Sequence, residues 1–372
     1  MMKDKYYSIR NLINVVPNAY YYVVFGERSN GKTYSVLDYS LDRYFKNNEK
    51  LAIVRRYKED LKGKNGASMF SALVTNKVID KYSKGKWNSI WYYSQRWYLM
   101  KVDKKTGEKV VDDEPFAYGF ALTDVEHDKS TSYPDVKNIL FDEFITRQMY
   151  LNDEFTIFMN VLSTIIRDRD DVRVFMCGNT VNQYCPYFKE MGLYRVREMP
   201  KGKIDVYTYG ESNLRVAVER SDFPQKTKKS DVYFAFDNPK LKMITSGEWE
   251  IPIYPRLTPE MKFVPNDIYY HYFIQFEETL LMCEIVKKNN MIFTFIHLKT
   301  TPIKEDDHSI VYCPEINPLP NYRRKITKPM TKADKKILWF FAHEKVFFQS
   351  NEVGEVVRNY LVWCETTSMT RM

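Results

Sequence analysis

The first 200 residues of the chain alternate short apolar runs with segments whose apolar positions recur at helical spacing. The runs are largely uninterrupted, and they lie at residues 20–25, 51–56, 138–141 and 172–177. Runs of this kind are typical of parallel strands that are buried on both faces. Between them, residues 32–45 and 152–166 have the periodicity of helices. The alternation predicts an α/β domain.

Aromatic residues dominate the stretch between the second and third of these runs. Residues 87–111 predict an aromatic hairpin that turns at residues 104–107 (Lys-Lys-Thr-Gly), and residues 116–123 predict a further strand. Residues 68–82 precede the hairpin with a helical pattern. We place the α/β domain at residues 1–197.

The pattern changes near residue 198. Met-Pro-Lys-Gly at residues 199–202 interrupts it, two short strand-like pieces follow at 204–209 and 214–218, and residues 221–230 are polar. We expect a small linker module over residues 198–230 and a second domain over residues 231–372. In that domain, residues 268–300 predict three consecutive strands, and residues 352–364 predict an amphipathic helix.

One loop between a predicted strand and a predicted helix has the spacing of a phosphate-binding loop, G-x-x-x-x-G-K-[ST]. Its residues are Gly26, Glu27, Arg28, Ser29, Asn30, Gly31, Lys32 and Thr33. The two glycines let the backbone N–H groups face one point, and Lys32 adds a cation for the β- and γ-phosphates. Thr33 offers a hydroxyl to Mg²⁺. Because the chain has only 13 glycines in 372 residues, a chance glycine turn in this context is a poor alternative. The sequence predicts a site for a nucleoside triphosphate.

Two further strands end in polar side chains. The run at residues 138–141 leads into Asp142 and Glu143, which we assign as the carboxylate on the metal side and the general base. A strand capped by solvated acids is the alternative. The run at residues 172–177 leads into Gly178, Asn179 and Thr180, where Asn179 or Thr180 could sense the γ-phosphate. An ordinary strand-to-loop turn is the alternative there.

Arginines alternate with acids just before that last strand, in the segment at residues 166–173. Hydrolysis of a triphosphate needs positive charge on the transferring phosphoryl group, and an arginine often supplies it. Arg167 or Arg169 could do so for a neighbouring subunit. A solvated loop with internal salt bridges explains the same pattern.

Composition narrows the class of protein. A net charge of +8 favours a polyanionic partner without requiring one. The five cysteines form no C-x-x-C pair, which indicates reduced thiols in a cytosolic protein. The five histidines show no metal-ligand spacing. Because no apolar run approaches about 18 residues and the N-terminus is polar, we expect neither a membrane span nor a signal peptide.

Four segments together resemble the DNA-packaging ATPase of phi-twenty-nine-type podophages. They are residues 53–58 (Ile-Val-Arg-Arg-Tyr-Lys), 129–134 (Lys-Ser-Thr-Ser-Tyr-Pro), 141–145 (Phe-Asp-Glu-Phe-Ile) and 167–169 (Arg-Asp-Arg). The resemblance covers about residues 15–200 and is much weaker beyond. It implies a RecA-like P-loop NTPase domain of the additional-strand, catalytic-glutamate class, with ATP and Mg²⁺ as cofactors.

The resemblance also implies partners and further site residues. The family forms a homo-oligomeric ring, a pentamer, on the portal vertex of the prohead and drives double-stranded DNA into it. Lys129 and Arg167 match residues that act on the adjacent subunit's ATP, so Arg167 is preferred over Arg169. Lys58 matches a lysine of a loop that faces the pore, and Arg56, Lys62 and Lys64 join it as expected DNA contacts; a mobile surface loop is the alternative. A prohead RNA is a possible further partner. The expected location is the host cytoplasm, with transient attachment to the portal vertex and absence from the mature virion.

For the second domain, the resemblance implies an RNase H-like fold. A nuclease of that type needs several carboxylates that converge on two metal ions. The first predicted strand carries no aspartate, and Glu277, Glu278 and Glu284 fall at strand ends or on exposed faces, so we expect a vestigial fold without nuclease activity. The segment at residues 323–336 carries seven basic residues against one acid, Asp334. It could hold DNA phosphates or a structural RNA, or be a plain solvated face.

Two classes of function remain open on this evidence. The first is an ATP-driven translocase of double-stranded DNA. The alternative is another P-loop machine: a terminase large subunit with an active nuclease, a helicase, or a nucleotide-dependent switch.

Overall fold

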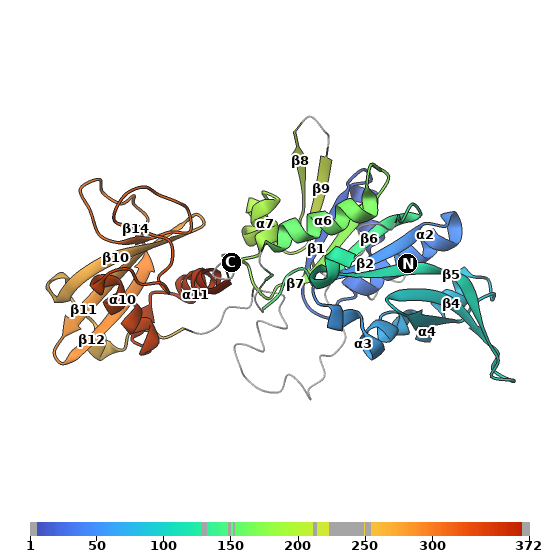
Figure 1. The fold of residues 1–372 in the computed structure, drawn as a ribbon, viewed down its shortest axis with the longest axis horizontal. Coiled ribbons are helices and arrows are strands. Elements are labelled where there is room, and N and C mark those ends of the chain that lie inside the picture. The colour runs from blue at the N-terminus through green and yellow to red at the C-terminus, as the bar shows by residue number, and fades with distance from the viewer. Residues whose placement is uncertain are drawn as a thin grey trace. The chain divides into compact units, whose positions relative to one another are not determined.

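The computed structural model describes residues 6–127, 132–147, 150–151, 153–210, 214–222, 249 and 254–366. The chain divides into two compact units, Met1–Glu250 and Ile251–Met372 (Figure 1). None of the described helices has the length and apolarity needed to cross a membrane.

A nine-stranded sheet organises the first unit, in the order β3-β4-β5-β2-β6-β7-β1-β9-β8. Its six central strands are mutually parallel and lie in the order β5, β2, β6, β7, β1 and β9. An antiparallel hairpin extends the sheet at each edge. The strands are β1 Tyr21–Gly26, β2 Lys50–Arg55, β3 Ser89–Tyr93, β4 Arg96–Val102, β5 Lys109–Ala121, β6 Val136–Asp142, β7 Arg173–Asn179, β8 Ile204–Tyr209 and β9 Leu214–Ser221.

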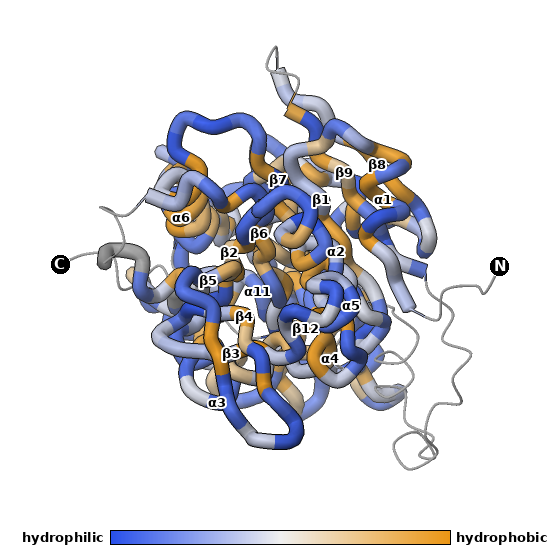
Figure 2. The backbone as a smooth tube through the Cα atoms, turned by 90° about the vertical axis from the view of Figure 1, so that its right-hand side faces the viewer, coloured by the Kyte–Doolittle hydropathy of each residue, from blue (hydrophilic) through white to orange (hydrophobic). Residues whose placement is uncertain are grey.

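Two apolar layers cover the central strands because successive side chains point to opposite faces. Val23 and Phe25 of β1 pack into one core with α6, whereas Tyr22 and Val24 pack into the other with α1 and α2. In Figure 2 the central strands run mainly in hydrophobic colours and the peripheral loops in hydrophilic ones. The helices of this unit are α1 Ile9–Val15, α2 Lys32–Asn47, η1 Lys58–Leu61, α3 Gly63–Ser68, α4 Ser71–Thr75, α5 Val78–Tyr82, η2 Leu122–His127, α6 Glu154–Ile166, α7 Pro186–Glu190 and η3 Tyr194–Glu198.

The strand order confirms the predicted P-loop fold of the additional-strand class. The strand that precedes the glycine loop, β1, and the strand that ends in Asp142, β6, are not neighbours, because β7 lies between them and pairs with both. The carboxyl ends of all three strands therefore meet at one edge of the sheet, which is where ligands bind in open α/β sheets.

Several predicted boundaries differ from the structure. Residues 204–221, expected in a separate linker module, form the β8–β9 hairpin, and residues 216–221 of β9 pair with all of β1. The compact units divide at Glu250 rather than at residues 197 and 230. The helix expected at residues 68–82 is broken at Lys77, whose φ is +56°. The aromatic segment holds an extra turn at Ser94 and Gln95, both at positive φ, so it makes two hairpins instead of one.

A mixed six-stranded sheet organises the second unit, in the order β14-β13-β10-β11-β12-β15. The three consecutive strands predicted from the sequence are present as an antiparallel meander, β10 Ile268–Phe276, β11 Thr279–Lys288 and β12 Met291–Leu298. The predicted closing helix is α11 Asn351–Thr366. The remaining elements are η4 Pro259–Met261, η5 Pro265–Asp267, β13 Val311–Tyr312, β14 Tyr322–Arg323, α10 Lys332–Ala342 and β15 Val346–Phe348. The RNase H-like assignment of this unit stays a prediction.

Candidate functional site

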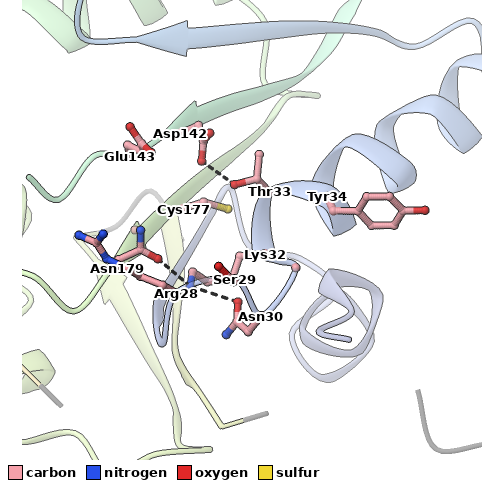
Figure 3. A pocket seen from close by; sticks show the side chains of 12 residues that line it. Arg28, Ser29, Asn30, Lys32, Thr33, Tyr34, Asp142, Glu143, Cys177 and Asn179 are labelled. Carbon is pink, nitrogen blue, oxygen red and sulfur yellow. Dashed lines mark hydrogen bonds between the residues drawn. The ribbon is translucent and has the colours of Figure 1, made fainter. Parts of the chain in front are cut away.

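The glycine loop curls between the end of β1 and the start of α2. Gly26 and Gly31 have φ of +152° and +92°, conformations that favour glycine. A Cβ on Gly26 would lie 2.4 Å from the Ser221 hydroxyl of β9, so the neighbouring strand also demands glycine there. The loop wraps a cavity of about 350 Å³ at the carboxyl edge of the sheet (Figure 3). Its walls are Arg28, Ser29, Asn30, Gly31, Lys32, Thr33, Tyr34, Asp142, Glu143, Cys177, Gly178 and Asn179.

Lys32 reaches across the inside of the loop. Its Nζ donates to the Glu27 carbonyl at 2.6 Å, to the Asn30 side chain at 3.1 Å and to the Asn179 side chain at 3.2 Å. Asn179, at the end of β7, thus lies in the cavity beside the loop lysine, and its role as a sensing residue stays a prediction. Burial lowers the pKa of Lys32 to about 8. The site therefore holds a cation whose charge is costly without an anion nearby.

Thr33 and Asp142 meet directly. The Thr33 hydroxyl donates to Asp142 Oδ1 at 2.7 Å, as Figure 3 draws. Burial raises the pKa of Asp142, and the charge of Arg55 and the Thr33 hydrogen bond oppose that rise. A hydroxyl and a carboxylate are hard oxygen ligands that suit Mg²⁺. Within the described part of the chain, no group of three or more His, Cys, Asp or Glu side chains could hold a metal ion. An ion at Thr33 and Asp142 would therefore take its other ligands from phosphate oxygens and water.

Arg55, the last residue of β2, is a site residue that the sequence reasoning missed. Its Nη1 donates to Asp142 Oδ2 at 2.7 Å and its Nη2 to Glu143 Oε2 at 2.8 Å. The guanidinium therefore bridges both carboxylates that follow β6. The signal was present in the sequence, because Arg55 ends a predicted strand and the ends of adjacent parallel strands share one edge. What the sequence did not give was that β2 and β6 are neighbours.

Glu143 sits in an unusual backbone conformation, with φ of +60°. Its side chain is 59% exposed, far more than that of Asp142 at 10%, so water has access to it. Non-glycine residues at positive φ cost free energy and cluster at functional sites. An exposed carboxylate beside a buried, hydroxyl-bonded one fits the predicted division between general base and metal-side ligand.

Arg56 was predicted to contact DNA, and the structure contradicts this. Its side chain is 5% exposed, and it forms a two-pronged ion pair with Glu154 of α6, from Nε at 2.8 Å and from Nη2 at 2.9 Å. It also donates to the carbonyls of Glu143 and Phe144, at 3.2 Å and 2.9 Å. Arg56 thus fastens the turn that carries Glu143. Side chains alternate across a strand, so Arg55 and Arg56 leave β2 toward different surroundings.

The three lysines of the expected pore loop follow β2. Lys58 forms an ion pair with Asp124, and its backbone N–H donates to the Thr123 hydroxyl at 3.2 Å. Lys62 is exposed, although it pairs with Glu59 at 3.3 Å, and Lys64 is exposed on α3. The loop therefore presents cations to solvent, mainly through its later lysines. Lys129 lies outside the described residues.

The two candidate arginines after α6 have different surroundings. Arg169 donates to five backbone carbonyls, those of Tyr133, Pro134, Val136, Ile165 and Ile166. It ties the end of α6 to the start of β6. Arg167, the C-cap residue that follows α6, has an exposed side chain and a φ of +53°. Both lie at the amino edge of the sheet, away from the chain's own cavity.

The strand order, the glycine loop and the carboxylates beside it define a P-loop nucleotide-binding protein of the additional-strand class. The model of the podovirus DNA encapsidation protein family (Gp16) matches residues 1–235, more than half of the chain. The chain belongs to this family.

Individual relatives support the same placement. The chain is 29% identical over 168 residues to the DNA packaging proteins of Bacillus phages phi29 and PZA, which covers 44% of this chain and 44% of each relative. It is 27% identical over 208 residues to the DNA packaging protein of Bacillus phage B103, covering 55% of this chain and 57% of that relative. The matched region thus spans about half the length of these relatives.

Two solved structures share the fold over nearly the whole chain. The bacteriophage Phi-29 viral genome packaging motor assembly matches with a TM-score of 0.55 at 19% identity, covering 96% of this chain and 97% of that one. The Phi-28 gp11 DNA packaging motor matches with a TM-score of 0.52 at 18% identity, covering 100% of both chains. At such identities the likeness concerns the fold alone.

Proposed function

We propose that this chain is the ATPase of a phage DNA-packaging motor, which hydrolyses ATP to move double-stranded DNA through the portal into the prohead. The observation that carries the proposal is the cavity in which Lys32, Thr33, Asp142, Glu143 and Asn179 meet. Membership of the encapsidation family supports a role in DNA packaging, and the residues of the cavity support ATP hydrolysis.

The chemistry follows from the contacts in that cavity. ATP phosphates would take the hydrogen bonds that Lys32 now gives to the Glu27 carbonyl and to Asn30. Thr33 and Asp142 would hold Mg²⁺, which neutralises charge on the phosphates when bound. Glu143 would orient the attacking water and accept its proton, and Asn179 would report on the γ-phosphate through its contact with Lys32. Arg55 restrains Glu143, so hydrolysis requires that contact to loosen.

A ring of subunits completes the site in this proposal. Helix α6 has 13 residues and is about 20 Å long, and it runs from the turn beside Glu143 to Arg167. The Arg167 side chain cannot span that length to its own cavity. An arginine at the far edge of the sheet can act only on a neighbouring subunit's ATP, as the family resemblance implies for Arg167 and for Lys129. Arg169 is committed to backbone carbonyls, which leaves Arg167 as the better candidate.

Contacts with DNA are assigned to the loop after β2. Lys62 and Lys64 are exposed there, and Lys58 would have to leave Asp124 to join them. Phosphate contacts suit a motor that must ignore sequence. The portal, and a prohead RNA where one exists, are further partners in this proposal, with the pentameric ring transiently attached to the portal vertex in the host cytoplasm.

The second unit has no nuclease role in this proposal. Glu277 and Glu278 form the turn between β10 and β11, whereas Glu284 lies within β11 and faces His297 at 3.6 Å. Carboxylates so distributed do not converge on a pair of metal ions. Nicking of a supercoiled plasmid with Mn²⁺, lost in Glu277→Ala, would overturn this part and favour a terminase with an active nuclease.

The first test is steady-state ATP hydrolysis with and without linear duplex DNA, for the wild type and for Glu143→Gln. Duplex DNA should stimulate the wild type, and the variant should bind ATP with near-normal affinity but lose at least about a hundredfold in turnover. Stimulation by single strands together with strand separation would favour a helicase. Tight nucleotide binding with slow turnover that ignores DNA, in the presence of the prohead as well as without it, would favour a nucleotide-dependent switch.

A further inference from the structure

Trp249 packs against the residue that leads into the phosphate loop. Its ring stacks on that of Phe25 at 5.4 Å, with 17° between the two planes, and Phe25 is the residue of β1 directly before Gly26. Trp249 is 8% exposed, and its indole N–H donates to the Arg197 carbonyl of η3 at 3.3 Å. The indole is therefore held at two points, its ring face and its N–H group.

This stack belongs to a larger group of packed aromatic side chains. We call Phe25, Phe144, Phe188 and Trp249 the ring cluster, and all four lie in the same apolar core. Phe188 of α7 contacts the other three, with ring centres at 5.9 Å from Phe25, 5.8 Å from Phe144 and 6.3 Å from Trp249. Because protein interiors are close-packed, one ring of such a cluster cannot shift without displacing its neighbours.

The ring cluster contacts the ends of three strands that carry site residues. Phe25 precedes the glycine loop at the end of β1, and Phe144 follows Glu143 after β6. Phe144 also packs against Gly178 of β7, which lines the cavity and where a Cβ would lie 2.9 Å from the phenyl ring. A displacement of Trp249 would therefore reach both the phosphate loop and the turn that carries the general base.

Trp249 also lies where the chain leaves the first unit. That unit ends at Glu250, and the second begins at Ile251, so the ring cluster holds the chain one residue before the boundary. An earlier segment is fastened to the same place, because Ser221 at the end of β9 donates its hydroxyl to the Phe25 carbonyl at 3.2 Å. Phe25 is thus held through its carbonyl by β9 and through its ring by the residue that precedes the second unit.

We propose that Trp249 is a positioning residue of the nucleotide site. Through Phe25 it holds the root of the phosphate loop, and it carries the occupancy of the site to the chain that enters the second unit. The inference rests on the proposed function for the identity of the nucleotide, ATP, but it requires neither hydrolysis nor DNA. Coupling of this kind is reciprocal, so a shift of Trp249 also changes the affinity of the loop for phosphate groups. A tryptophan that only filled the core would stabilise the unit without affecting that affinity.

The first measurement is the affinity of the full chain for a fluorescent ATP analogue with Mg²⁺. Trp249→Leu removes the ring, whereas Trp249→Phe keeps a ring for Phe25. Because the stacking of two rings corresponds to about a twofold to tenfold change in an equilibrium constant, the leucine variant should lose about that much affinity and the phenylalanine variant less. The matched control is Trp87→Leu, since Trp87 is 7% exposed and packs in the other apolar core of the same unit. Both leucine variants should lower the urea midpoint, but the control should keep the wild-type affinity.

The second measurement is tryptophan emission during titration with a non-hydrolysable ATP analogue. The emission of the wild type and of Trp87→Phe should change as the site fills, and Trp249→Phe should lose that change. Wild-type affinity in Trp249→Leu, or an equal loss in Trp87→Leu, would overturn the inference. So would an emission that does not respond in the wild type, or one that responds equally in Trp249→Phe. Failure of the proposed function gives a different result, in which Trp249-dependent binding is intact but duplex DNA does not stimulate turnover.

Discussion

Replacing Arg56 by methionine should destabilise the first unit and leave the proposed DNA contacts intact. The guanidinium gives four hydrogen bonds, two to Glu154 and one each to the carbonyls of Glu143 and Phe144. Methionine keeps much of the apolar stem but none of these donors. Among the described residues, Glu154, whose side chain is 0% exposed, would retain the Tyr187 hydroxyl and the Leu151 N–H as hydrogen-bond donors.

The expected magnitude follows from breaking one side of a buried ion pair. Leaving a buried carboxylate without its cation costs about 3–5 kcal/mol, a large share of the stability of a typical domain. In the double variant Arg56→Met/Glu154→Gln the stranded charge is gone, so the double variant should be more stable than the sum of the single changes by about 1–3 kcal/mol. Turnover should also fall, because Arg56 fastens the turn that carries Glu143.

Urea denaturation at neutral pH measures the stability, and duplex binding under native conditions measures the DNA contacts. Lys62→Met is the control, because it removes an exposed cation from the loop that follows the same strand. It should weaken DNA binding and leave the urea midpoint unchanged. The reasoning is refuted if Arg56→Met unfolds within about 1 kcal/mol of the wild type and yet loses affinity for DNA.

Three other predictions concern the site and its supports. The pKa of Lys32 is lowered to about 8, so its ammonium group loses the proton as the pH rises through that value. The affinity for a fluorescent ATP analogue should therefore be constant below about pH 8 and fall up to tenfold per pH unit above it. A constant affinity up to about pH 9.5 would contradict this prediction. Arg55→Gln removes a cation that opposes the raised pKa of Asp142, so the pH at which turnover falls on the acid side should move to a higher value. If that pH does not move, Asp142 is not the group whose protonation stops turnover. Arg169→Gln should cost about 2–3 kcal/mol in urea denaturation with little effect on turnover of the folded ring, whereas Arg167→Gln should abolish turnover; the reverse ranking would exchange their roles.

The sequence by itself determined the glycine loop and the strand ends around it. Eight consecutive residues specify the loop, because the conformations at Gly26 and Gly31 are local and only glycine adopts them readily. Asp142, Glu143 and Asn179 were predicted in the same way, since each lies just after an apolar run that predicts a buried strand. The positions of β1, β6 and β7 followed from those runs.

Only the tertiary structure decided which of these elements are neighbours. Arg55 meets Asp142 because β2 lies beside β6, and the β8–β9 hairpin joins the sheet because β9 pairs with β1. From the sequence, Arg56 and Arg169 were both candidates for exposed cations. In the structure Arg56 is buried against Glu154, and Arg169 donates hydrogen bonds to five backbone carbonyls. The physical reason is the range of the interactions. A loop conformation is set by the stereochemistry of a few adjacent residues, whereas strand order and the burial of a charge depend on the free energy of the whole packed domain.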